Sequence, residues 1–146
     1  MILSAVPTVE QLCHSDRAVE HGIDNAPPPE VVLNMQKHLA PGLQKVSEML
    51  GHPLTHSSGY RCQRLNELVG GSKTSAHMQG YAEDFICPAY GAPVDIVHKL
   101  VASGLKFDQL IQEGSWVHVS FDPRMRQMLE TAHFSAGSKP SYTMGA

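Results

Sequence analysis

The segment SAHMQGYAEDF, residues 75–85, decides how the middle of this 146-residue chain folds. Its polar first half predicts a loop that ends at Gly80, and its second half predicts a strand with Ala82 and Asp84 on one face. Of the nine histidines in the chain, only His77 has an acidic residue at the seventh position after it, which is Asp84. The pair is therefore not a by-product of histidine content. It is either half of a metal site or part of a polar loop that runs into a strand.

Length and composition define the class of protein around this segment. A chain of this length, with 42% hydrophobic and 17% charged residues, predicts one globular domain over residues 1–146. The formal net charge of -3 offers no basic excess, so we expect no nucleic-acid partner. No apolar run approaches the roughly 20 residues of a membrane-spanning helix, so we expect no membrane insertion. We also expect a monomer, with Cys13, Cys62 and Cys87 as free thiols.

Periodicity, capping residues and breakers predict the elements on either side of the segment. Helices are expected over 8–22, over 30–51 with a kink or break at Pro41, over 62–71 and over 92–104. Strands are expected over 53–61, over 81–87 and twice within 107–121, and the Gly/Ser-rich tail over 135–146 is expected to be irregular. Helices followed by strands predict an α+β fold: one compact domain in which N-terminal helices pack on a small antiparallel sheet.

The expected hairpin within 107–121 places a second histidine beside a carboxylate. Gly114 and Ser115 suit a two-residue turn with glycine first, which would pair Glu113 with Trp116. In that register Glu113 lies on the same face as His118, one diagonal step away. A slip of one residue would separate them.

Two histidines and one aspartate from separate elements match the ligands that a catalytic zinc ion uses, with a fourth position left for water. A carboxylate such as Glu113 would accept a proton, and Arg61 would hold the substrate or a developing oxyanion. Taken by spacing alone, a simpler explanation competes with this one. His77 would then be a loop residue, Asp84 a strand-edge acid and His118 an ordinary sheet histidine.

Residues 58–85 and 107–121 together resemble the zinc D-alanyl-D-alanine peptidase family, and the likeness extends from about Thr8 to Tyr142. The family signature S-x-H-x-x-G-x-A-x-D is met in full, and the later W-x-H segment and the upstream SGYR, Asn66 and GGSK elements also agree. The residues that match the two motifs are Ser75, His77, Gly80, Ala82, Asp84, Trp116 and His118. The resemblance implies the DD-peptidase/hedgehog-like zinc fold.

The resemblance also implies roles for individual residues. His77, Asp84 and His118 would bind Zn²⁺, and Arg61 would contact a substrate carbonyl or carboxylate. Ser75 and Trp116 would line the substrate site, although Trp116 is equally explained as a sheet-packing aromatic. Several relatives carry the catalytic acid three residues before the last histidine ligand, where this chain has Ser115. Glu113 is therefore our candidate for the general base, with Asp108 as the alternative.

The remaining histidines receive ordinary explanations. His52 and His56 are expected to be exposed, and His14 and His21 are expected to lie on a helix surface or to pack between helices.

The resemblance implies a zinc peptidase that cleaves peptidoglycan stem peptides at a D-Ala-D-Ala, D-Ala-diaminopimelate or L-Ala-D-Glu bond. The first residues, MILSAVPTVE, show no positively charged n-region, so we expect synthesis in the cytoplasm without a signal peptide. Compact relatives of this kind resemble phage or prophage endolysins, which act on the cell wall after release. The alternative function is a non-catalytic wall-binding or virion module with a structural zinc ion.

Overall fold

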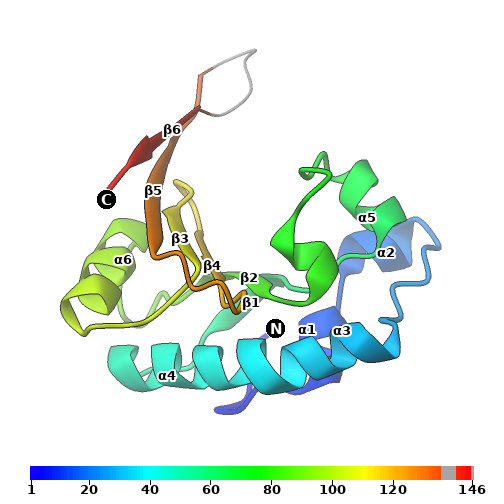
Figure 1. Cartoon of the computed structure of the whole chain (residues 1–146), viewed down its shortest axis with the longest axis horizontal. Coiled ribbons are helices and arrows are strands. Elements are labelled where there is room, and N and C mark those ends of the chain that lie inside the picture. The colour runs from blue at the N-terminus through cyan, green and yellow to red at the C-terminus, as the bar shows by residue number, and fades with distance from the viewer. Residues whose placement is uncertain (136–140, 146) are drawn as a thin grey trace.

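The computed structural model describes residues 1–135 and 141–145 and has the predicted α+β architecture (Figure 1). The helices are α1 (Val9–Cys13), α2 (Asp16–Glu20), α3 (Pro29–Asn34), η1 (Met35–Leu39), α4 (Ala40–Leu50), α5 (Gln63–Leu68), η2 (Ala76–Gln79) and α6 (Pro93–Ala102). The strands are β1 (Thr55–Ser58), β2 (Ala82–Ile86), β3 (Gln109–Gln112), β4 (Val117–Ser120), β5 (Met128–His133) and β6 (Ser141–Met144). No helix within the described residues is long and apolar enough to cross a membrane.

The N-terminal region forms two short helices instead of the single helix predicted over 8–22. The capping box at Thr8 is present, because the Thr8 side chain accepts a hydrogen bond from Gln11 N and the Gln11 side-chain oxygen accepts one from Thr8 N. Ser15 interrupts the helix, since its backbone is extended and its hydroxyl oxygen accepts from Ala18 N. A second N-cap inside the segment thus begins a new helix, α2.

The long helix seen along one edge of Figure 1 is built from α3, η1 and α4. Its irregularity is the π-helical turn η1, immediately before the predicted break at Pro41. Proline has no N–H to donate to the preceding turn, so the regular ladder cannot pass through this point. Apolar residues at helical spacing line one face of this helix: Met35, Leu39, Leu43, Val46 and Leu50 are buried, and Val32 is half-buried.

The six strands form one sheet in the order β1-β2-β4-β3-β5-β6. The sheet is mixed and not purely antiparallel as predicted, because β5 runs parallel to β3. The predicted irregular tail also contains a strand, since β6 pairs with β5 through 130–133 and 141–144. Residues 136–140 of that tail lie outside the described part of the chain. β5 and β6 form an arm on the side of the molecule away from the long helix (Figure 1).

The hairpin between β3 and β4 has the predicted register. Glu113 N donates to Trp116 O at 3.0 Å, Ile111 pairs with His118, and Gly114 has a φ of 79°. One face of the sheet packs into the apolar core through Phe85, Leu110, Val117 and Val119. The opposite face presents Asp84 and His118, which are directly paired between β2 and β4.

Candidate metal centre

Three elements bring His77, Asp84 and His118 together. His77 comes from η2, Asp84 from β2 and His118 from β4. The Asp84 Oδ1 atom lies 2.9 Å from His118 Nδ1 and 3.3 Å from His77 Nε2. One potential ligand atom from each residue falls within a mutual distance of 4.8 Å. The structure therefore assembles the trio that the sequence singled out.

The local fold explains how His77 reaches this position. The Ser75 hydroxyl oxygen accepts a hydrogen bond from His77 N and begins η2. Gly80 ends it with a φ of 77°, and a Cβ there would lie 2.8 Å from a Val31 side-chain carbon. Glycine is thus required both by the left-handed backbone and by the close packing of α3. The chain then enters β2, whose alternation directs Asp84 back towards His77.

The hydrogen bonds of His77 orient its ring for a ligand. Its Nδ1 atom lies 2.8 Å from the Gly59 carbonyl oxygen, which only accepts, so Nδ1 carries the proton. Burial lowers the pKa of His77, while Asp84 acts in the opposite direction. A neutral ring protonated at Nδ1 leaves the Nε2 lone pair available to a cation at the cavity, where Asp84 Oδ1 lies 3.3 Å away. A carbonyl that holds the far nitrogen is the usual support of a metal-binding histidine.

Asp84 keeps its negative charge in this environment. Burial acts to raise its pKa, but the neighbouring imidazoles of His77 and His118 hold the pKa of Asp84 far below its ordinary value. Its partner His118 uses Nδ1 towards Asp84, with Nε2 3.4 Å from Gln109 Oε1. Two ring nitrogens and one carboxylate oxygen fit zinc, the metal that the resemblance implies, because catalytic zinc takes three N/O ligands of this kind.

A cavity of about 450 Å³ opens in front of the trio, and Arg61 and Trp116 lie on its wall. The Arg61 Nη2 atom donates to Ser75 Oγ at 3.4 Å, and its buried Nε has no hydrogen-bond partner within the described residues. Burial lowers the pKa of Arg61, whereas Asp84 raises it. An arginine with an unused buried donor beside a cavity can receive a carbonyl or carboxylate oxygen.

Glu113 lines the same cavity as the trio. Burial raises its pKa, His118 counters the rise, and Asp84 and Glu130 add to it. A pKa raised towards neutrality suits a group that must both accept and release a proton. The predicted juxtaposition of Glu113 and His118 across the hairpin is therefore present.

Asp108 is placed elsewhere, and its prediction as an alternative base is wrong. Its side chain is fully buried and does not line the cavity. Arg126 holds both carboxylate oxygens, with Nε–Oδ1 at 2.9 Å and Nη2–Oδ2 at 2.8 Å. A carboxylate engaged on both oxygens by one guanidinium is a structural anchor between the start of β3 and the segment before β5.

His56 also departs from its prediction, since its side chain is buried instead of exposed. Its Nδ1 lies 2.6 Å from Glu83 Oε2, and its Nε2 donates to the His14 carbonyl oxygen at 2.9 Å. The partner Glu83 is fully buried on the core face of β2. His52 and His21 are exposed as expected.

Sequence reasoning missed two residues of the cavity, Phe134 and Tyr142. Phe134 follows β5, and Tyr142 belongs to β6, in the tail predicted to be irregular. The only available signal was the short alternation in SYTM, which Gly and Ser neighbours obscure.

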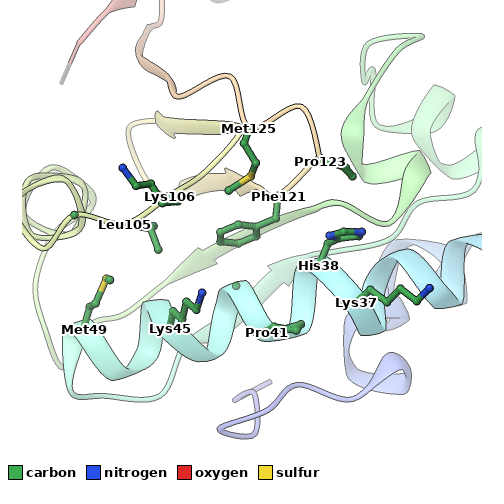
Figure 2. A pocket seen from close by; sticks show the side chains of 12 residues that line it. Lys37, His38, Pro41, Lys45, Met49, Leu105, Lys106, Phe121, Pro123 and Met125 are labelled. Carbon is green, nitrogen blue, oxygen red and sulfur yellow. The ribbon is translucent and has the colours of Figure 1, made fainter.

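A second groove, of about 500 Å³, lies between α4 and the loops before β3 and after β4 (Figure 2). Phe121 and Leu105 contribute apolar surface, and Lys37, Lys45 and Lys106 also line it. No carboxylate or cysteine occurs among its twelve lining residues, so it offers no ligand set for a cation. Among the described residues, only His77, Asp84 and His118 form a group of three His, Cys, Asp or Glu side chains close enough together to hold a metal ion.

Comparison with known proteins agrees with this site. A family model described as Peptidase M15 matches residues 7–120, which is more than half of the chain and includes all three residues of the trio. No curated protein matches the chain.

Proposed function

Because the chain belongs to the peptidase M15 family, we propose that it is a zinc peptidase that cleaves peptidoglycan stem peptides. The main observation behind this proposal is the His77–Asp84–His118 trio. Its potential metal-ligand atoms lie close together in a cavity that Glu113 and Arg61 also line. Family membership supports metallopeptidase chemistry. The assignment of ligands, base and substrate is our proposal.

In this proposal His77 Nε2, His118 Nδ1 and one Asp84 oxygen hold the zinc ion. When bound, zinc polarises a carbonyl oxygen and lowers the pKa of a coordinated water to about 7. Glu113 accepts a proton from the attacking water and delivers it to the leaving amine. Its raised pKa, which burial causes, favours this exchange near neutral pH.

Arg61 is the residue that gives the proposal its substrate class. Zinc and a general base can act on any peptide carbonyl, so selectivity has to come from other groups. Stem peptides carry free carboxylates near their scissile bonds, through terminal D-Ala, the α-carboxylate of D-Glu or diaminopimelate. The guanidinium fork of Arg61 matches such a carboxylate, and the unused buried Nε is a donor for it.

Digestion of three substrates tests this proposal: intact sacculi, defined stem peptides and casein. We expect the zinc-loaded protein to cleave sacculi or stem peptides with negligible action on casein, and mass spectrometry of the muropeptides will identify the bond. Arg61→Lys should lower the rate to a different extent on each stem peptide. Casein digestion with inert sacculi would refute the wall substrate.

The alternative function, a binding module with a structural zinc ion, predicts a different result in the same assay. Such a module would retain zinc and bind sacculi without releasing any peptide. Glu113 argues against it, because a carboxylate with a raised pKa beside an open metal position has no purpose in a binder.

A role as a phage or prophage endolysin is a further part of the proposal. Turbidity loss of outer-membrane-permeabilised cells after external addition of the protein tests it.

A further inference from the structure

The β5–β6 arm lies outside the family match, which ends at residue 120, yet it reaches the metal cavity. Strand register explains how. Ile111 on β3 pairs with Glu130 on β5, and Ala132, two residues further, pairs with Tyr142 on β6. Since paired residues share a face and alternate residues return to it, Tyr142 lies on the same face of the sheet as Ile111.

Two aromatic side chains of the arm line the cavity together with residues of the β3–β4 hairpin. Phe134 packs on the turn, where a Cβ built on Gly114 would lie 3.2 Å from its ring. Tyr142 lines the same cavity as Glu113, and the charge of Glu113 contributes to raising the pKa of Tyr142. Both rings line the cavity, as Trp116 does, while remaining about half exposed at 54% for Phe134 and 47% for Tyr142.

We propose that this arm is the outer wall of the substrate groove, with Phe134 and Tyr142 holding the stem peptide and the Tyr142 hydroxyl positioning Glu113. The inference rests on the proposed function and adds the residues that set substrate contact and base orientation. Half-exposed aromatic rings at a polar cavity are typical of surfaces that bind a ligand, because they offer large contact area with little conformational freedom to lose.

The direction of the proposed hydrogen bond between Tyr142 and Glu113 follows from their chemistry. Burial raises the pKa of Tyr142, and the charge of Glu113 raises it further, so the phenol stays protonated at neutral pH. A protonated phenol donates and a carboxylate accepts. A donor on one carboxylate oxygen restricts rotation of the Glu113 side chain and leaves the other oxygen for the attacking water.

Kinetics of four variants separate the two roles. Phe134→Ala should raise KM roughly three- to tenfold with kcat within twofold of wild type, because only ring contact is lost. Tyr142→Phe keeps the ring and removes the donor, so kcat should fall roughly tenfold with little change in KM. Tyr142→Ala should show both effects. Met144→Ala is the matched control, since Met144 lies on the same strand, is 74% exposed and does not line the cavity.

A binding measurement makes the test independent of turnover. Trp116 is the only tryptophan in the chain and lines the cavity, so its fluorescence reports ligand entry. The probe is the stem pentapeptide, titrated into zinc-loaded Glu113→Gln protein, in which hydrolysis is slow. Adding Phe134→Ala or Tyr142→Ala should weaken binding at least threefold, and adding Met144→Ala should leave it unchanged. Zinc content and circular dichroism establish that each variant is folded.

The outcomes are distinct. Wild-type cleavage combined with arm variants that behave like Met144→Ala overturns the arm's role and leaves the peptidase intact. Binding that depends on Phe134 and Tyr142 without any cleavage overturns the peptidase and supports the wall. Absence of both binding and cleavage overturns both proposals.

Discussion

Glu83 and Asp84 are neighbours on β2, and each meets a histidine, but on opposite faces of the sheet. Glu83 points into the core, where its side chain has His56 as its one hydrogen-bond partner among the described residues, at 2.6 Å. Asp84 points into the cavity and contacts two histidines, at 2.9 and 3.3 Å. Two adjacent acidic residues, each beside histidine, therefore form a buried Glu83–His56 pair on one face, here called the sealed pair, and a candidate metal centre on the other.

The two carboxyl groups differ in charge because their surroundings differ. Burial raises the pKa of Glu83 to about 8, against the opposing effect of His56. Burial also acts to lower the pKa of His56, but the hydrogen bond and charge of Glu83 raise it overall. The two groups therefore titrate as one coupled pair. Asp84, with two partners and access to the cavity, remains a carboxylate. Partner number and cavity access separate the proposed metal ligand, Asp84, from the core residue Glu83.

The comparison is tested most directly by removing the carboxylate of Asp84 and that of Glu83 in separate variants. Asp84→Asn should lose the metal and lower activity roughly a thousandfold or more, because the bound ion contributes several kcal/mol of transition-state stabilisation. Elemental analysis of purified protein and stem-peptide kinetics measure the two effects. Retention of one zinc per chain in Asp84→Asn would contradict the ligand assignment.

A second change spares the metal and removes the proposed base. Glu113→Gln keeps the side-chain shape but cannot accept a proton, so turnover should fall by roughly 10² or more while zinc is retained. Asp108→Asn is the control, because Asp108 does not line the cavity and its loss should leave turnover near that of wild type. Near-normal turnover in Glu113→Gln would place the base elsewhere.

The sealed pair should respond in stability instead of activity. Glu83→Gln replaces one partner of a buried hydrogen bond with a neutral amide, and we expect a loss of about 1–3 kcal/mol in the free energy of unfolding. Zinc content and kcat should stay near wild type, since Glu83 faces away from the cavity. Urea unfolding and elemental analysis measure the two properties. Loss of zinc in this variant would show that the two faces of β2 are coupled.

The sequence was informative about the metal face because its signals are local. The S-x-H-x-x-G-x-A-x-D signature lies within one loop and strand, and the turn at Gly114 sets the register that brings Glu113 beside His118. Strand alternation alone then places Asp84 and His118 on one side of the sheet.

The core face and the arm depended on partners that are distant in sequence. His56 was predicted to be exposed because nothing near it shows that Glu83, 27 positions later, pairs with it. The parallel β5 was missed because its pairing with β3 carries no local pattern, whereas β6 was missed because Gly and Ser neighbours obscure its short alternation. Asp108 was misassigned for the same reason, since its partner Arg126 comes from the segment before β5.

Asp108 provides the smallest and most specific test, because its charge is held by an arginine and not by histidines. The hydrogen bond from Arg126 is the main reason that the pKa of Asp108 is lowered, and burial opposes it. A carboxyl group with a depressed folded-state pKa stabilises the protein above its unfolded pKa of about 3.9, and loses that contribution as the pH falls through the folded value.

Asp108→Asn should therefore lower the free energy of unfolding by about 1–2 kcal/mol at pH 7. The deficit should shrink steadily below about pH 4. Urea unfolding of metal-free protein at a series of pH values, with Asp95→Asn as an exposed control, measures this trend. A deficit that stays constant down to pH 2 would mean that Asp108 stabilises the fold by shape and not by charge.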